Sequence, residues 1–446
     1  MEYESATIKN EAAGEQRRER AILVGVELPN SKWPIDSSLA ELERLADTAG
    51  VDTVATVTQR LNTPNSRTFI GSGKAEEVAE MAQSLSADVV IFDDALTPSQ
   101  QKHLEDLMGK DIKVIDRTAL ILDIFALHAT SKEGRLQVQL AQNQYLLPRL
   151  RGMWSHLASG HMGGGVGSTF GEGENQLEVD RRIVRDRITS IKRQLAHLEE
   201  VRDVQRESRY TSGVFKVSLA GYTNSGKSSL LNYLTDADVL ADDMLFGTLD
   251  TTTRKYELPE GREITISDTV GFIQKLPTTL VEAFKSTLSE ITEADLILHI
   301  VDASSPEFER QIDTVNEVLD QIGAQGQSRV LVFNKCDLLD EEHLDALKNR
   351  YSNDLFISAL TGEGIDELID RISRIAAAQD ARMEVLIPYK RGDLVSVAHE
   401  RCNIESESHE AEGTHMVLLA KPEYAALFKP YLCNKEELGL EEEEQY

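Results

Sequence analysis

The sequence predicts an α/β protein with more than one domain, and two observations support this prediction. Short apolar segments alternate with amphipathic helical segments along most of the chain, which is typical of parallel sheets with helical crossovers. The chain also has 446 residues, enough for about three domains of about 150 residues each. Its hydrophobic content of 41% is sufficient for ordinary globular cores.

The first alternating region, residues 21–130, predicts an N-terminal α/β domain with a parallel sheet. The polar segment before it, residues 1–20, is expected to be disordered. Apolar or β-branched runs indicate the strands, and apolar residues at helical spacing indicate the helices. The predicted strands are 21–28, 51–59, 89–94 and 112–116, and the predicted helices are 37–49, 74–84 and 98–108, the last with Thr97 as N-cap and Gly109 as stop.

Residues 131–213 predict a helical hairpin around a Gly-rich loop. One helix is expected from Lys132 to Leu147, and a longer, charged helix from Asn175 to about Ser208. Between them, residues 159–173 read SGHMGGGVGSTFGEG, which cannot form a packed core and therefore predicts a mobile loop.

The hairpin is basic within an acidic chain. Residues 132–209 hold 13 Lys and Arg against 10 Asp and Glu, a formal charge of +3, whereas the remaining 368 residues carry −32. The net charge of −29 repels nucleic acid on average, but it does not exclude a local basic surface. A solvated helix face and a surface for a polyanion are both compatible with this composition.

A second alternating region and a smaller unit follow. Residues 214–380 predict strands at 214–222, 264–272, 295–303, 329–335 and 355–360, with helices near 227–235, 278–293, 307–322, 341–350 and 364–379. Residues 381–446 predict a small α+β C-terminal domain with strands at 385–389 and 415–420 and the acidic tail EEEEQY.

The composition argues against several other classes of protein. The chain has no run of 18 or more apolar residues, so we expect no membrane insertion. Its polar N-terminus lacks the apolar core of a signal peptide. Cys336, Cys402 and Cys433 are too few and too scattered for a disulfide framework or a zinc site. We therefore expect a cytoplasmic monomer.

A phosphate-binding loop is predicted at residues 221–228, which read GYTNSGKS and match G-x-x-x-x-G-K-[ST] between a strand and a helix. The glycines let the backbone amides surround phosphate oxygens at a helix N-terminus. Lys227 is expected to reach the β- and γ-phosphates, and Ser228 to ligate Mg²⁺. The residues predicted to surround the phosphates are Gly221, Tyr222, Thr223, Asn224, Ser225, Gly226, Lys227 and Ser228.

The sequence DTVG at 268–271 follows the next strand and supplies a second phosphate motif. Asp268 suits a carboxylate that supports Mg²⁺, and the Gly271 amide is expected to bond the γ-phosphate, so we assign Lys227 and Gly271 the catalytic roles. A Thr between the two motifs must complete the Mg²⁺ ligands in the triphosphate state; the candidates are Thr248, Thr251, Thr252 and Thr253. Further nucleotide contacts are predicted at Phe246, Gly247, Leu249, Asp250, Thr269 and Val270.

Two later motifs predict that the base is guanine. In NKCD (334–337), the Asp337 carboxylate can accept from the ring N–H and the exocyclic amine of guanine, a donor pair that adenine lacks. Asn334 would hold the geometry of the site, and the stem of Lys335 would cover the base. In SAL (358–360), the Ala359 amide can donate to the guanine carbonyl. The predicted base-binding residues are Asn334, Lys335, Cys336, Asp337, Ser358, Ala359 and Leu360. GTP and GDP are therefore the expected ligands of a P-loop GTPase domain at 214–380.

The position that orients the attacking water in ordinary small GTPases is altered. These proteins place a Gln directly after the Gly of D-x-x-G, where this chain has Phe272. We therefore expect slow intrinsic hydrolysis that a partner stimulates. Asn224 either coordinates a potassium ion near the phosphates, as in related GTPases that lack the Gln, or makes a hydrogen bond within the loop.

With these motifs, the chain resembles the HflX family of translational GTPases over nearly its whole length. The similar stretches are FIGSGKAEEV (69–78), VIFDDALTPSQQKHLE (90–105), VIDRTALILDIFALHA (114–129), GGGVG…GEGENQLEVDRR (163–182), GYTNSGKS (221–228) and TLD (248–250). The resemblance favours Thr248 as the threonine ligand of Mg²⁺. It also implies that the N-terminal domain and the hairpin bind the large ribosomal subunit, and that GTP binding drives splitting or rescue of ribosomes.

Contact with ribosomal RNA requires Arg and Lys side chains directed at phosphates, and the candidates are Arg149, Arg151, Arg181 and Arg182. The loop of the family usually carries an Arg and a Pro-Gly-Glu in its second half, where this chain reads STFGEGE. This departure and the net charge of −29 favour an alternative, a GTP-dependent regulatory switch that acts on a protein partner other than the ribosome.

Overall fold

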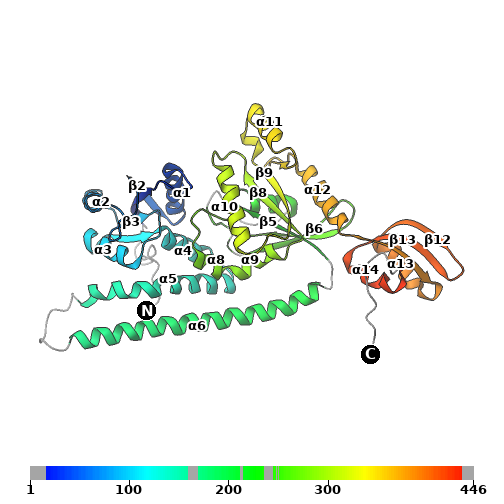
Figure 1. Ribbon diagram of the computed structural model, residues 1–446, viewed down its shortest axis with the longest axis horizontal. Coiled ribbons are helices and arrows are strands. Elements are labelled where there is room, and N and C mark those ends of the chain that lie inside the picture. Colours follow the sequence, from blue (N-terminus) through cyan, green and yellow to red (C-terminus); the bar gives the residue numbers. More distant parts are fainter. Residues whose placement is uncertain are drawn as a thin grey trace.

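The computed structural model describes residues 17–158, 169–210, 214–235, 245–247, 249 and 251–433, which form three β-sheets and a long helical hairpin (Figure 1). The first sheet and the third, smaller sheet lie on opposite sides of the central sheet. The predicted α/β fold class is confirmed. The acidic tail, 441–446, and residues 1–16 of the segment predicted to be disordered, 1–20, lie outside the described residues. The predicted end of that segment is wrong, because residues 19 and 20 already belong to a strand, β1 (Glu19–Glu27).

The N-terminal sheet is parallel, with the strand order β2-β1-β3-β4. Its elements are β1 (Glu19–Glu27), α1 (Ile35–Thr48), β2 (Val51–Arg60), α2 (Ser72–Ser84), β3 (Val89–Phe92), α3 (Pro98–Met108) and β4 (Lys113–Asp116). Helices α2 and α3 pack on the strand residues Ile22 and Val24, whereas α1 packs on Ala21 and Leu23 on the opposite face. Thr97 caps α3 as predicted, in a capping box with Gln100.

Helix α4 (Arg117–His128) begins directly after β4 and was not predicted. Asp116 caps it by accepting from the backbone of Ala119. Residues 117–125 are all buried, so the helix shows no polar face. The apolar spacing that identifies a surface helix is therefore missing, although the segment is helical.

The hairpin consists of α5 (Lys132–Ala158) and α6 (Thr169–Tyr210), which lie side by side (Figure 1). The predicted end of the first helix at Leu147 is wrong, because α5 continues through Pro148. A proline inside a helix costs about 3 kcal/mol, and packing of α5 against α3, α4 and α6 offsets this cost. Residues 169–173 are helical rather than part of the loop; the remaining loop residues, 159–168, lie outside the described residues.

The central sheet has the strand order β10-β9-β8-β5-β7-β6 and is parallel except for β6. Its elements are β5 (Phe215–Gly221), α7 (Lys227–Thr235), β6 (Thr252–Glu257), β7 (Glu263–Asp268), α8 (Thr278–Ala283), α9 (Lys285–Thr292), β8 (Leu296–Asp302), α10 (Phe308–Gln321), β9 (Ser328–Asn334), α11 (Glu341–Arg350), β10 (Leu355–Phe356) and α12 (Ile365–Ala378). The antiparallel strand β6 was missed, and the single helix predicted at 278–293 is two helices that separate at Phe284. The strands predicted at 264–272 and 355–360 are shorter, because their last residues form the loops of the site.

The third sheet is antiparallel, with the order β11-β13-β12, and helices α13 and α14 complete its core. The elements are β11 (Ala381–Pro388), α13 (Gly392–Arg401), β12 (Asn403–His409), β13 (Gly413–Ala420) and α14 (Pro422–Phe428), with short 3₁₀ helices at Tyr389–Arg391 and Lys429–Tyr431; a further 3₁₀ helix, Cys336–Leu338, follows β9. The sequence NIESESH of β12 is too polar to be predicted as a strand. No helix among the described residues has the length and hydropathy of a membrane span.

The N-terminal and central sheets share one hydrophobic cluster. Phe125 on α4 lies with its ring centroid 4.5 Å from that of Phe246 and 5.1 Å from that of Phe284. Leu39, Leu42 and the other apolar residues of α1 belong to the same cluster. The N-terminal unit (residues 17–128) therefore packs directly against the segments that connect the strands of the central unit (residues 214–378).

Candidate nucleotide-binding site

The predicted phosphate loop joins the end of β5 to the start of α7. Its turn needs φ values of +61° at Asn224 and +92° at Gly226. A Cβ atom at Gly226 would lie 2.1 Å from the Asn334 amide nitrogen, and one at Gly221 would lie 2.3 Å from the Ile300 carbonyl oxygen. Both glycines are therefore required by close packing around the loop.

Lys227 is buried at the base of the loop, where its Nζ donates to the carbonyl oxygens of Gly221 (3.2 Å) and Tyr222 (2.9 Å). Burial lowers the pKa of Lys227 to about 8, although Asp268 opposes the shift. A phosphate beside this ammonium group would restore its charged form, because an opposite charge at short range raises the pKa of a lysine. The loop thus presents a partly desolvated cation to an anionic ligand.

Ser228 and Asp268 bring a hydroxyl and a carboxylate together beside Lys227. The Ser228 hydroxyl donates to Asp268 Oδ2 at 2.6 Å, and Asp268 is fully buried at the end of β7. Oxygen ligands of this kind suit Mg²⁺. The residues that would hold the ion on this side are therefore Ser228, directly, and Asp268 behind it.

The segment after Asp268 lies against the phosphate loop. The Thr269 hydroxyl bonds the Leu219 carbonyl at 2.7 Å. A Cβ atom at Gly271 would lie 2.7 Å from Thr223 Cα, so only glycine allows this approach. Phe272 is 1% exposed, so its side chain is packed in the core rather than directed toward a phosphate.

The connection between α7 and β6 is described only in part. Thr248 and Asp250 lie outside the described residues, while Thr252 and Thr253 lie on β6, where the Thr253 hydroxyl bonds that of Ser267. The side chains of Phe246 and Leu249 are buried in the shared hydrophobic cluster. These two residues can therefore meet a nucleotide only through their backbone.

Asn334 links the phosphate loop to the two base motifs. Its Nδ2 donates to the Ser225 carbonyl at 2.9 Å, and its Oδ1 accepts from the Ala359 amide at 2.9 Å. Lys335 has φ +65°, and its Nζ lies 2.7 Å from Asp302 Oδ2. Asp337 is exposed at the start of the following turn, where its carboxylate can accept from a base.

The neighbours of these residues take structural positions. Ser358 is fully buried and Leu360 is 83% exposed, while Cys336 is buried and its thiol has a pKa raised to about 11, mainly by burial. The Cys336 thiol is therefore protonated near neutral pH and unreactive.

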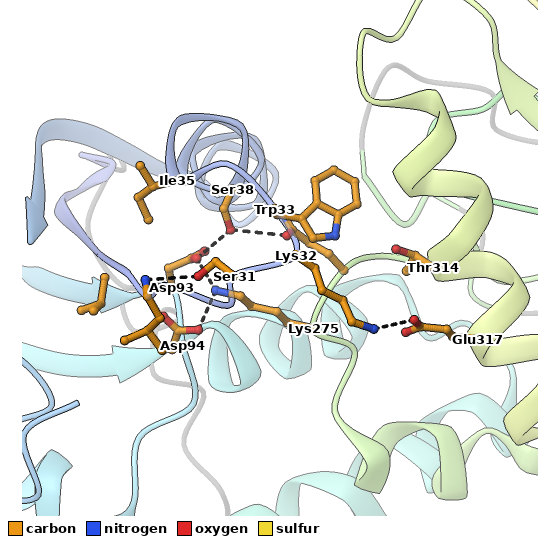
Figure 2. Close-up of a pocket in the computed structure, with 13 residues that line it drawn as sticks. Ser31, Lys32, Trp33, Ile35, Ser38, Asp93, Asp94, Lys275, Thr314 and Glu317 are labelled. Carbon is orange, nitrogen blue, oxygen red and sulfur yellow. Dashed lines mark hydrogen bonds and ion pairs between the residues drawn. The ribbon is translucent and has the colours of Figure 1, made fainter. Parts of the chain in front are cut away.

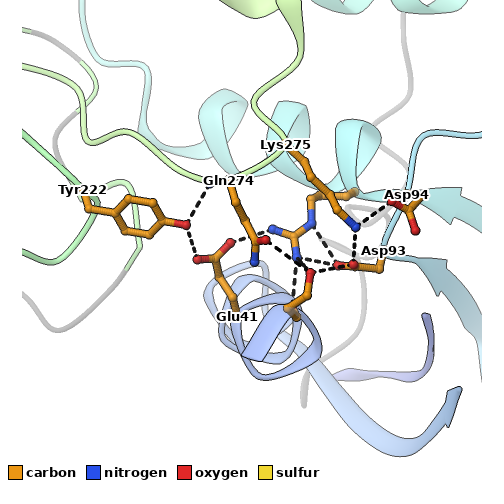
Figure 3. Close-up of polar contacts among 8 residues, drawn as sticks. Glu41, Asp93, Asp94, Tyr222, Gln274 and Lys275 are labelled. Carbon is orange, nitrogen blue, oxygen red and sulfur yellow. Dashed lines mark hydrogen bonds and ion pairs between the residues drawn. The ribbon is translucent and has the colours of Figure 1, made fainter. Parts of the chain in front are cut away.

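Tyr222 lies in the phosphate loop, but its side chain points away from the loop toward the N-terminal unit (Figure 3). Its hydroxyl donates to Glu41 Oε2, 181 residues earlier in the chain. No local signal in the sequence identifies this contact.

The RNA-binding candidates have different environments. Arg149 is largely buried, stacks over the ring of Tyr145 and donates to Gln101, Leu96 and Asp116. It therefore fastens α5 to the N-terminal unit, and most of its guanidinium N–H groups are occupied by contacts within the protein. On α6, Arg182 is exposed and Arg181 is half-buried, whereas the side chain of Arg151 lies outside the described residues.

A phosphate loop, a Ser–Asp pair suited to Mg²⁺ and an Asn–Lys–x–Asp base motif stand at the carboxyl edge of one sheet. This fold and site define the class of P-loop GTPases. Four family models match consecutive parts of the chain: "GTP-binding GTPase N-terminal" at 36–126, "GTP-binding GTPase Middle Region" at 128–209, "50S ribosome-binding GTPase" at 216–335 and "HflX C-terminal domain" at 345–426.

Similar proteins extend over most of the chain. The GTPase HflX of Caldanaerobacter subterraneus subsp. tengcongensis is 45% identical over 396 residues, 89% of this chain and 90% of that protein. The GTPase HflX of Escherichia coli K12 is 41% identical over 406 residues, covering 91% and 94%. A solved GTP-binding protein from Sulfolobus solfataricus in complex with GDP is 24% identical, with a TM-score of 0.41 and coverage of 80% and 98%. The chain belongs to the HflX family of GTPases, and it is a GTP hydrolase.

Proposed function

We propose that this GTPase binds the large ribosomal subunit in its GTP state, in the cytoplasm, and that this binding splits or rescues ribosomes. The observation that carries the proposal is the match of residues 216–335 to a family described as a 50S ribosome-binding GTPase. The order of the other matched regions supports it, because they place the basic helical hairpin between the N-terminal unit and the GTPase unit.

The solvent face of α6 offers a surface for ribosomal RNA. Four exposed basic side chains recur at helical spacing along this face, which we call the α6 basic stripe: Arg182, Arg185, Lys192 and Arg193. Val184 and Ile191 are buried on the other side of the helix, so the stripe faces away from α5. A row of cations of this kind binds phosphates through counterion release, without regard to sequence.

Sedimentation with purified large ribosomal subunits tests the proposal. Binding is expected with a non-hydrolysable GTP analogue and not with GDP. Replacing Arg182 and Arg185 by Glu is expected to weaken binding and to reduce its dependence on salt concentration by about two phosphate contacts. The matched control is Arg374→Glu, on an exposed face of α12.

Failure to sediment in either nucleotide state would favour the second candidate, a GTP-dependent switch that acts on another protein partner. The net charge of −29 supports this candidate, because most of the surface repels RNA. Sedimentation that is equal with GTP analogue and GDP would contradict the GTP dependence of the first proposal.

We infer that hydrolysis is slow until a partner completes the site. Phe272 is buried in the core where ordinary small GTPases place the Gln that orients water. The catalytic group must then come from another part of this chain or from the partner. A single-turnover rate that large subunits do not increase would contradict this inference.

Mg²⁺ would be held by Ser228 and by the expected Thr248, with Asp268 behind them. Potassium at Asn224 is a further proposal, supported by the φ of +61° that turns this residue at the tip of the loop. Hydrolysis that is faster in potassium than in sodium buffer, with the difference lost in Asn224→Ala, is the expected result. Equal rates in both buffers would leave Asn224 with a role in loop geometry.

A further inference from the structure

A ring of polar contacts joins the N-terminal unit to two segments of the nucleotide site (Figure 3). The Tyr222 hydroxyl donates to Glu41 Oε2 at 2.5 Å and accepts from the backbone N–H of Gln274 at 2.8 Å. Glu41 lies on α1, and Gln274 lies three residues after Gly271. One hydroxyl therefore connects the phosphate loop, the segment after D-x-x-G and the N-terminal unit.

The ring closes through buried charges. Arg117, at the start of α4, donates from Nη1 to Glu41 Oε1 at 2.7 Å and from Nη2 to Asp93 Oδ1 at 2.5 Å. Asp93 Oδ2 lies 2.5 Å from the Nζ of Lys275, the residue after Gln274. The same ammonium group lies 2.6 Å from Asp94 Oδ1. Around the ring, the carboxylates of Glu41 and Asp93 thus alternate with the cations of Arg117 and Lys275, and Asp94 pairs with Lys275 from outside the ring.

Most of the ring is buried. Glu41, Asp93 and Arg117 are each at most 3% exposed. Burial by itself would raise the pKa of Asp93, but Arg117 and Lys275 outweigh it and lower this pKa to about 2. Burial and then the Glu41 carboxylate raise the pKa of Tyr222, which keeps the hydroxyl protonated as a donor. The Asp93 carboxylate therefore stays ionised and the Tyr222 hydroxyl stays protonated over the physiological range of pH.

The backbone at Lys275 is held in an unfavourable conformation. Its φ is +55°, in the left-handed region that is unfavourable for a residue with a side chain. The ion pairs to Asp93 and Asp94 hold it there. Closer to the site, the Phe272 amide donates to the Gly221 carbonyl at 3.1 Å and its carbonyl accepts from Thr223 at 2.7 Å. The segment 271–275 is thus held against the phosphate loop at Phe272 and against the N-terminal unit at Lys275.

We propose that Tyr222 and Lys275 are positioning residues for the triphosphate, which act through the backbone of residues 271–275. The γ-phosphate of GTP needs the Gly271 amide, whereas GDP does not reach it. The ring orders this segment before the nucleotide binds, so it favours GTP over GDP. This role depends on the expected contact of Gly271 with the γ-phosphate and is independent of any contact with the ribosome.

Two variants of the full-length protein test the role. Tyr222→Phe removes the shared hydroxyl. Lys275→Met removes the ammonium group that pairs the segment 271–275 with Asp93, which keeps Arg117 and Ser38 as partners. The affinity for a non-hydrolysable GTP analogue is expected to fall about tenfold, the size of one hydrogen bond to a charged group. The affinity for GDP is expected to stay within about twofold, and the single-turnover rate of GTP hydrolysis is expected to fall.

Lys32→Met is the matched control. Lys32 lines the same pocket between the two units as Lys275, but its Nζ pairs at 2.5 Å with Glu317 of α10 rather than with a member of the ring (Figure 2). This variant also removes an ion pair between the units, but it should leave the ratio of GTP to GDP affinity unchanged. Lys275→Arg keeps the charge and is expected to restore most of that ratio.

Two results would overturn the proposal. The first is an equal loss of GDP and GTP-analogue affinity, or no loss of either, in both test variants while their melting temperatures remain close to that of the parent. The second is tighter binding of the GTP analogue, which would make the ring a restraint rather than a support. If Tyr222→Phe melts early, Lys275→Met decides the outcome, because its side chain is already 35% exposed.

Discussion

The Ser228 hydroxyl, in the first turn of α7, and the Asp268 carboxylate, at the end of β7, lie 2.6 Å apart, where both can serve one Mg²⁺ ion. Ser228→Ala removes the direct ligand and leaves the buried carboxylate in place. Loss of one ligand or of its support typically lowers metal affinity about 10- to 100-fold. We therefore expect the Mg²⁺ concentration needed for half-maximal GTP hydrolysis to rise by that factor. Ser225→Ala in the same loop is the control, because the Ser225 hydroxyl is not expected to bind Mg²⁺. An equal rise in the Mg²⁺ requirement of this control would contradict the role of Ser228.

Asp337→Asn is expected to change which base is accepted. The Asn amide can no longer accept two hydrogen bonds from guanine, but it can donate to the carbonyl that xanthine carries at the same position. A site built on such bonds discriminates between nucleotides by about 10⁴. The variant should therefore lose most of its affinity for GTP and gain affinity for xanthosine triphosphate. Competition binding with both nucleotides measures this exchange. Unchanged preference for GTP would show that Asp337 does not contact the base.

GTP binding is expected to weaken as the pH rises through about 8. The pKa of Lys227 is lowered from 10.5 to about 8, mainly by burial. Bound phosphate favours the charged form, so above this pH binding takes up a proton and affinity falls by up to tenfold per pH unit. The stability of the free protein changes in the opposite direction. Between pH 8 and 10.5 the unfolded state binds more protons at Lys227 than the folded state, so the free energy of unfolding rises with pH. Lys227→Arg stays charged, and its affinity should show no such pH dependence; a similar slope in both proteins would contradict the assignment.

Phe125→Ala should destabilise the interface between the N-terminal and central units. The ring is 1% exposed and packs edge-on against Phe246 and Phe284. Removing a buried Phe side chain costs about 3–5 kcal/mol. Chemical denaturation in a Trp154→Phe background, followed by the fluorescence of Trp33 beside Tyr222 at this interface, measures the change. A loss below about 1 kcal/mol would show that the two units are not packed together in solution.

The local motifs made much of the nucleotide site predictable. At Gly221 and Gly226 the neighbouring atoms lie so close that only glycine fits. The spacing of these two glycines therefore identifies the phosphate loop from the sequence alone. The same holds for Asn334, whose amide holds neighbouring loops together as expected. Alternating apolar strands likewise predicted the fold class and most element positions.

The remaining features depend on contacts between distant parts of the chain. Helix α4 lacks a polar face because two units bury it, and α5 continues through Pro148 because its neighbours support it. Tyr222 takes its orientation from Glu41, and Arg149 is occupied by groups of α3 and the loop before it. These partners are distant in sequence, so the contacts cannot be predicted from residue spacing or composition.

The hydrophobic cluster shared by Phe125, Phe246 and Phe284 has a consequence for biosynthesis. About 160 residues separate the first of these rings from the last, and a nascent chain grows by about 5–20 residues per second. The apolar side of α1 and α4 therefore emerges some ten to thirty seconds before the residues that cover it. During that interval the newly made N-terminal half exposes an apolar surface. Chaperones bind surfaces of this kind, so we expect one to bind here until the GTPase half has folded onto it.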